Sequence, residues 1–108
     1  MEIWTYDNRI NDNNSVIIIY DELVYNNEVI TFIGIKNVII NEEIVDIDFM
    51  PFKSSVLKKC LKEKINDELV SLDFNLENTI EGWKKDNGGI WSIPVSEAIE
   101  ITEKTIEG

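Results

Sequence analysis

Histidine is absent from all 108 residues of this chain, and cysteine occurs once, at Cys60. Without an imidazole the chain has no ordinary base near neutral pH, no Ser-His or Cys-His nucleophile, and no histidine metal ligand. A single thiol excludes an intramolecular disulfide and a zinc site built from cysteines alone. The composition therefore favours binding over catalysis, and we assign no catalytic residue, metal site or cofactor.

Long hydrophobic runs are also missing. Runs such as Val16–Tyr20 are far too short to span a bilayer, and the first residues lack the basic and apolar regions of a secretory signal. Glycine-rich phosphate loops, nucleophile elbows and zinc-ligand spacings do not occur. We therefore expect a soluble cytoplasmic protein that does not enter a membrane.

Basic residues are scarce and unevenly placed. The chain has 21 Asp and Glu against 10 Lys and Arg, a formal net charge of −11. Five of the ten bases lie between Lys53 and Lys64, whereas the first fifty residues carry ten acids and two bases. An anionic surface is repelled by nucleic acid phosphate and by anionic lipid, so the expected partner is a basic protein.

The remaining composition is that of a folded domain. Hydrophobic residues make up 44% of the chain and include 19 isoleucines, whereas disordered chains are poor in β-branched and aromatic residues. The length suits one core. We expect a single compact domain over residues 1–108.

The first half of the chain is rich in β-forming residues divided by asparagine. Alternation is clearest from Ile44 to Phe49, where Val45, Ile47 and Phe49 are expected on one side and Asp46 and Asp48 on the other. Asparagine tolerates the positive φ of tight turns, and Gly34 marks a bulge or a close backbone approach. The sequence predicts strands at 3–6, 16–20, 29–35, 38–40 and 44–49, with turns at 25–28 and 41–43.

The second half has apolar residues at helical spacing. A helix is expected from an N-cap at Ser54 or Ser55 to about Leu69, and a second one after an Asn75 cap. A final helix is expected after Ser96 as N-cap, with Ala98, Ile99, Ile101 and Ile106 on its packing side. The predicted class is α+β, an antiparallel sheet with about three helices, mostly C-terminal, packed on one face.

Two aspartates on one side of a strand have two interpretations. Asp46 and Asp48 form the solvated face of a half-exposed strand, or they hold a divalent metal for phosphoryl chemistry. A metal-dependent enzyme of that kind remains an alternative, and its further ligands would come from Glu42, Glu43, Asp21 and Glu22.

Three other features also have more than one interpretation. Cys60 is a buried structural cysteine, or a thiol activated by nearby lysines. The lysines of the predicted helix form a solvated face or a phosphate site, or they dock on the acidic sheet of a second copy. Trp83 and Trp91, on either side of Gly88 and Gly89, are core residues or interface anchors. A monomer and a homodimer both remain open.

An acidic, β-rich stretch from Val29 to Phe49 is followed by a closing stretch from Thr79 to Pro94 that carries Trp83, Gly88-Gly89 and Trp91. In size, charge and composition the chain resembles small bacterial immunity proteins of contact-dependent inhibition and other polymorphic toxin systems. The resemblance implies an antitoxin whose partner is a cognate cytotoxic domain, often a nuclease, that is encoded beside it.

Nuclease sites are basic because they bind phosphate, so an anionic protein is attracted to them over long distances. Carboxylates then replace the substrate phosphates as partners of Lys and Arg, and an aromatic or aliphatic centre supplies affinity. A phage-encoded inhibitor of a host defence enzyme has the same chemistry and remains an alternative. The expected contacts are Asp46, Asp48, Glu42 and Glu43, with Trp91 as a further anchor.

Overall fold

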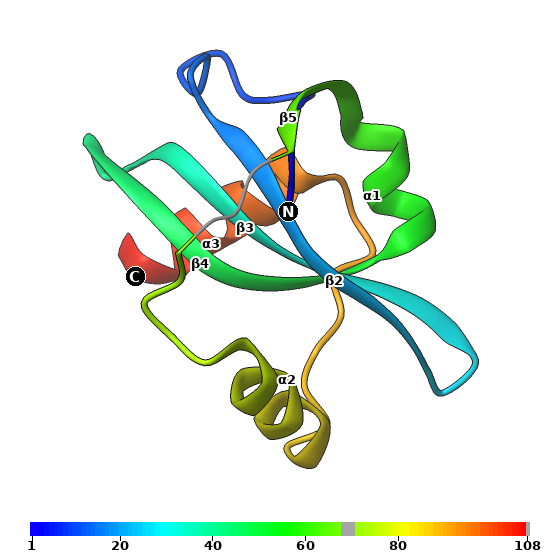
Figure 1. Cartoon of the computed structure of the whole chain (residues 1–108). Helices are drawn as coiled ribbons and strands as arrows, with labels where there is room; N and C mark the ends of the chain where they lie inside the picture. The colour runs from blue at the N-terminus through cyan, green and yellow to red at the C-terminus, as the bar shows by residue number, and fades with distance from the viewer. Residues whose placement is uncertain (68–70, 108) are drawn as a thin grey trace.

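The computed structural model describes residues 1–67 and 71–107, and within them the strands form one five-stranded sheet (Figure 1). All strand pairs are antiparallel, in the order β4-β3-β2-β1-β5. Four strands come from the N-terminal half and the helices mostly from the C-terminal half, which confirms the α+β class. The elements are β1 (Glu2–Tyr6), β2 (Val16–Tyr25), β3 (Glu28–Ile40), β4 (Glu43–Lys53), α1 (Ser54–Cys60), β5 (Leu61–Asp67), α2 (Leu76–Lys85) and α3 (Val95–Glu107).

Asparagine forms the tight turns of both long hairpins. Asn26 and Asn27 have φ of 52° and 66°, so the β2–β3 turn lies where the sequence predicts it. Positive φ at both central positions matches the right-handed twist of the flanking strands, and asparagine adopts it more readily than most residues. The predicted β3–β4 turn is also confirmed, with φ of 50° at Asn41 and 69° at Glu42.

The sheet buries side chains on both faces, which divides the core into two clusters. Along β3, Ile33 and Ile35 pack with α1 and α3, whereas Ile30 and Phe32 pack with α2. Figure 1 shows α3 behind the sheet and α2 at its lower side. The expected packing on one face thus describes α1 and α3. Helix α2 lies on the opposite face, because successive β3 residues of both faces are apolar.

A β-bulge in β4 changes which residues point to each face. The β3–β4 register shifts by one residue between Ile33 and Ile35, so β4 carries one extra residue there. Strict alternation predicts Phe49 on the side of Ile47, and this is wrong. Phe49 stacks on Phe32 in the α2 cluster, with 5.4 Å between ring centroids. One inserted residue reverses the alternation beyond it.

The single helix expected up to about Leu69 is two elements. Helix α1 ends at Cys60, the next residue Leu61 is extended with ψ of 136°, and β5 then pairs with β1. That pairing satisfies backbone groups along the outer edge of β1, a long-range gain that outweighs local helix propensity. Residues 68–70 lie outside the described residues.

One of the three predicted N-caps is confirmed. Asn75 caps α2, because its Oδ1 accepts the backbone N–H of Asn78 at 2.9 Å. Helix α1 begins directly at Ser54, which does not cap it; the buried Ser54 hydroxyl hydrogen-bonds Thr31 instead. Helix α3 begins one residue before Ser96, so Ser96 lies within the helix and is not its cap.

The packing side predicted for α3 is half correct. Ala98 and Ile99 are fully buried, whereas Ile101 is 45% exposed and Ile106 is 61% exposed. Ile101 lies about 200° around the helix from Ile99, at 100° per residue, and therefore leaves the buried stripe. Ile106 belongs to the exposed last turn.

Cys60 and Trp83 are core residues, as their structural interpretations predict. Cys60 is a free thiol with 6% exposure, and Trp83, at 9%, donates its indole N–H to the Gly89 carbonyl at 3.0 Å.

Among the described helices, none combines the length and the apolar character that a bilayer crossing needs.

Arg9, the one arginine of the chain, links three parts of the fold. It lies between β1 and β2, and its Nε contacts the Asp12 carboxylate at 2.7 Å. Its Nη2 donates to the Ile39 carbonyl of β3 at 2.7 Å, and its Nη1 contacts Glu103 of α3 at 3.0 Å. Asp12 is buried and also accepts the Ile39 N–H at 2.9 Å. The guanidinium therefore compensates a carboxylate that has no access to water.

We expect the substitution Arg9→Met to lower the free energy of unfolding by about 3 kcal/mol, because it leaves the buried Asp12 carboxylate without its cation. Urea denaturation of both proteins measures this loss. Lys62→Met is the control, since Lys62 pairs with Asp7 at 3.6 Å on an exposed surface and its loss costs less than about 1 kcal/mol. Equal losses in the two variants would contradict this role of Arg9.

Candidate functional site

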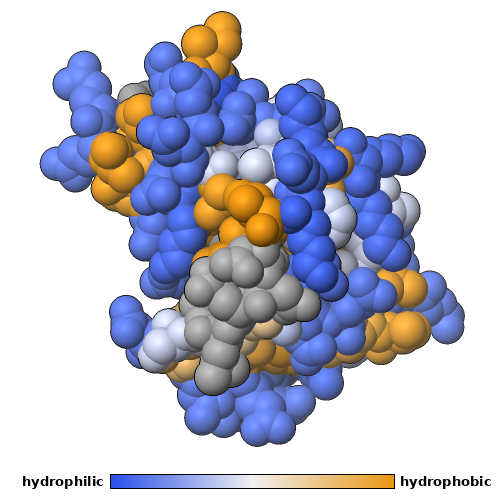
Figure 2. All heavy atoms as spheres, turned by 45° about the horizontal axis from the view of Figure 1, so that its top comes forward, coloured by the Kyte–Doolittle hydropathy of each residue, from blue (hydrophilic) through white to orange (hydrophobic). Residues whose placement is uncertain are grey.

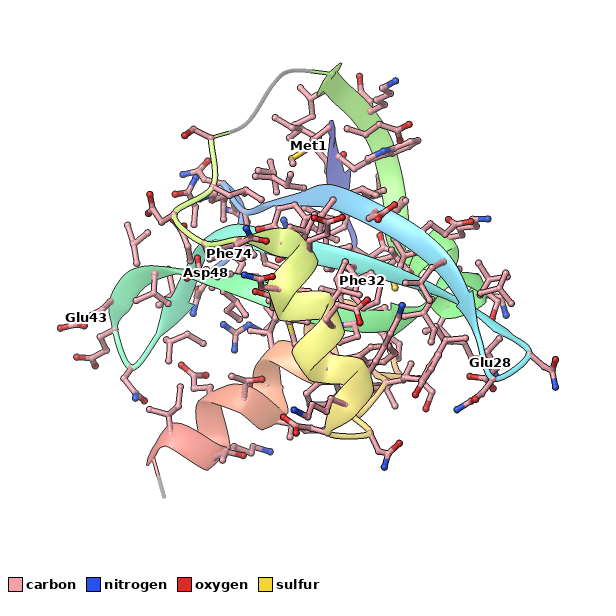
Figure 3. All side chains as sticks on the ribbon, turned by 60° about the horizontal axis from the view of Figure 1, so that its bottom comes forward. Met1, Glu28, Phe32, Glu43, Asp48 and Phe74 are labelled. Atoms are coloured by element: carbon pink, nitrogen blue, oxygen red, sulfur yellow. The ribbon has the colours of Figure 1, made fainter. Side chains whose placement is uncertain are left out.

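The tip of the β3–β4 hairpin presents two carboxylates to solvent. Glu42 occupies the turn, Glu43 begins β4, and both are exposed (Figure 3). The neighbouring Asn41 N–H donates to Glu103 of α3 at 2.9 Å, which holds the tip in place. This hydrogen bond, helped by Arg9, lowers the pKa of Glu103 below its ordinary value.

Asp46 and Asp48 point to the same side of β4, as the alternation predicts, and both are exposed. Asp46 is held in place: its carboxylate accepts the Asn37 N–H at 3.1 Å and contacts the Lys36 ammonium at 3.2 Å. The Asn37 hydrogen bond is the largest single cause of a pKa of Asp46 below its ordinary value. The hydrogen bond and the charge of Lys36 lower this pKa further, whereas burial raises it. Lys36 therefore neutralises this one carboxylate of the four.

Asp48 has no ion pair or side-chain hydrogen bond among the described residues, but its backbone is anchored. Its carbonyl accepts the Tyr20 hydroxyl at 2.7 Å, and Tyr20 meets Phe74 edge-on at 5.8 Å between ring centroids (Figure 3). Burial, followed by the charges of Asp48 and Asp46, raises the pKa of Tyr20 to about 12. Gly34 fits here because a Cβ at that position would clash with the Tyr20 ring.

Ile44 is the functional candidate that the sequence analysis missed. It lies between Glu43 and Asp46, and 73% of it is exposed. The signal was present in the alternation, because a residue one position before Val45 belongs to the wet side of the strand. We call Glu42, Glu43, Ile44, Asp46 and Asp48 the acidic hairpin. Beside Ile44 is a hollow of about 350 Å³ lined by Asn11, Asn13, Asn14, Asn37, Ile39 and Ile44.

Trp91 lies at the other end of β4. Its N–H donates to the Pro51 carbonyl and its carbonyl accepts the Lys53 N–H, both at 2.9 Å. Its ring, partly buried, stacks on Phe52 with 6.4 Å between centroids. At about 3.3 Å per residue, six residues of strand separate it from Asp46 by roughly 20 Å. The structure therefore brings the four acids together on one hairpin and leaves Trp91 apart from them.

The lysines expected on one helix face are divided between two elements. Lys58 and Lys59 lie on α1, whereas Lys62 and Lys64 lie on β5. A continuous basic helix that docks on the acidic sheet of a second copy is therefore not formed. Among the described residues, no group of three or more Asp, Glu, Cys or His side chains is arranged to hold a metal ion.

Most of the surface seen in Figure 2 is hydrophilic, and its hydrophobic side chains form separate small groups. The acidic hairpin combines both characters, since it carries four exposed carboxylates and one exposed isoleucine. Comparison with known family models, curated proteins and solved structures gives no match.

We expect the pKa of Asp46 to stay below its ordinary value of 3.8 in the variant Lys36→Met, because the Asn37 N–H remains and lowers this pKa by more than burial raises it. Carbon-13 NMR titration of the carboxylate measures it. The stabilisation from the low pKa is complete above the unfolded pKa and is lost as pH falls through the folded one. A return of the pKa to 3.8 in the variant would show that Lys36 alone sets it.

Proposed function

We propose that this protein is an immunity protein that binds and neutralises a basic cognate toxin domain, a nuclease, through the acidic hairpin. One observation carries the proposal. Glu42, Glu43 and Asp48 are exposed at one hairpin and have no ion pair among the described residues. These carboxylates are available to an external cation, whereas Asp12 and Glu103 are paired with Arg9, and Glu81 with Lys84.

The net charge of −11 supports rapid capture of such a partner. A surface that binds phosphate is basic, so the whole-molecule field draws the two proteins together before contact. Attraction of this kind raises association rates to about 10⁸–10⁹ M⁻¹s⁻¹ at low salt. At contact, carboxylates accept hydrogen bonds from Lys and Arg in place of the substrate phosphates, which occludes the toxin surface without any chemical step.

Ile44 supplies the apolar centre that a stable interface needs. Interfaces are typically held by a few apolar or aromatic residues surrounded by polar contacts that exclude water. Ile44 is 73% exposed and is flanked by Glu43 on one side and by Asp46 on the other. Burying this side chain contributes about 2 kcal/mol. It takes the place that the sequence analysis gave to Trp91.

The conformation of Glu42 also supports a role outside folding. Its φ of 69° lies in the left-handed region, at a turn position where glycine is the preferred residue. A side chain there costs about 1 kcal/mol or more relative to glycine. Among the described residues, the Glu42 side chain makes no hydrogen bond or ion pair that would offset this cost.

The variant E42Q/E43Q/D46N/D48N tests the proposal. Affinity capture from the cells that produce the protein, followed by chemical crosslinking, identifies the partner of the unmodified chain. We expect a basic protein whose toxicity the chain suppresses. Against that partner the variant associates at least about tenfold more slowly, with a flatter salt dependence.

The matched control is E63Q/E77Q/E81Q/D86N, which removes the same number of charges from exposed positions on β5 and at α2. Its association slows less than that of the hairpin variant, because only the total charge differs from the unmodified chain. Equal rates for the two variants, or an acidic physiological partner, would refute the proposal.

A further inference from the structure

Strand β4 forms one edge of the sheet, and its two halves differ in whether another segment pairs with their outer side. The half that ends at Lys53 is already paired, because the Trp91 backbone makes two hydrogen bonds to Pro51 and Lys53 in a parallel bridge. This edge therefore accepts an extended chain beside it. Among the described residues, no segment pairs with the outer side of the half from Glu43 to Asp48.

The hairpin geometry shows which backbone groups of the open half point outward. A two-residue turn makes Ile40 and Glu43 the hydrogen-bonded closing pair, so Ile39 and Ile44 are a non-hydrogen-bonded pair. The backbone N–H and C=O of Ile39 point away from β4, because the N–H donates to Asp12 and the carbonyl accepts from Arg9. By the same alternation, the N–H and C=O of Ile44 point away from β3 and are open to a new strand.

The side chains of the open half select the charge of an incoming strand. A second copy paired edge to edge would place carboxylates of this hairpin against each other, which is destabilising. A strand with Lys or Arg at alternate positions would instead place them beside Asp46 and Asp48, which share one face of β4, and opposite charges across a strand pair favour pairing. The β4 bulge limits the regular edge to residues 43–48.

We infer that the basic partner binds by adding an extended, lysine- or arginine-bearing segment to residues 43–48 of β4. This inference rests on the proposed function and specifies its mode of contact. Backbone hydrogen bonds from the Ile44 edge give the complex its register, and the acidic side chains give it its preference for basic sequences.

A short peptide of alternating lysine and valine serves as the probe, with a second peptide in which alternate backbone amides are N-methylated. The two peptides have the same charge, but the second cannot donate backbone hydrogen bonds along one of its edges. We expect the first to bind and to protect the Ile44 amide from hydrogen exchange, and the second to bind at least about tenfold more weakly. NMR titration of the unmodified protein measures both effects.

Equal binding of the two peptides, without protection of the Ile44 amide, would overturn strand addition and leave charge-based capture standing. Absence of binding by both peptides at low salt would overturn strand addition and also count against capture by the acidic hairpin. Binding of the first peptide alone, with protection at residues outside β4, would likewise overturn the inference.

The variants Ile44→Pro and Ile44→Ala separate the backbone from the side chain. Both remove the exposed isoleucine, but only proline removes the outward N–H, at an edge position where it is tolerated. We expect the proline variant to bind the first peptide several-fold more weakly than the alanine variant does. Equal affinities of two folded variants, with folding checked by circular dichroism, would overturn the inference.

Discussion

The contact between Arg9 and the buried Asp12 is the constraint on which the hairpin end of the molecule depends. Asp12 accepts the Ile39 N–H, Arg9 donates to the Ile39 carbonyl, and Glu103 binds both Arg9 and the Asn41 N–H. These bonds take the place of a neighbouring strand along β3 beyond Lys36, where the pairing with the first residue of β2 stops, and they attach α3 to the hairpin. The position of the acidic hairpin is therefore set by one cation that several acids share.

Acidic residues consequently have two roles in this fold. Some hold it together, as Asp12 and Glu103 do, and their charges are compensated within the molecule. Others, such as Glu43 and Asp48, are exposed without an ion pair among the described residues. The net charge of −11 does not separate these roles, and the side-chain contacts do. The acidic hairpin contains three acids of the second group, Glu42, Glu43 and Asp48, beside Asp46, which is paired with Lys36.

Patterns of short range predicted much of this architecture. The presence of the first four strands, both asparagine turns and the Asn75 cap follow from side-chain chemistry within a few residues. The predictions that were wrong depend on distant partners. Residues after Cys60 have helical spacing but pair with β1, and Phe49 leaves its predicted side because of a bulge in the β3–β4 register. The four acids were predicted together, whereas Ile44 was missed and Trp91 lies apart.

The sequence by itself determined the net negative charge, the absence of histidine and the alternation that places Asp46 beside Asp48. Only the tertiary structure decided that β4 is an edge strand, that its far half is covered by Trp91, and that Ile44 remains exposed. The physical reason is the distance along the sequence over which each property is set. Charge and side-chain periodicity are properties of neighbouring residues, whereas register, edges and exposure depend on which distant segments pair across the sheet.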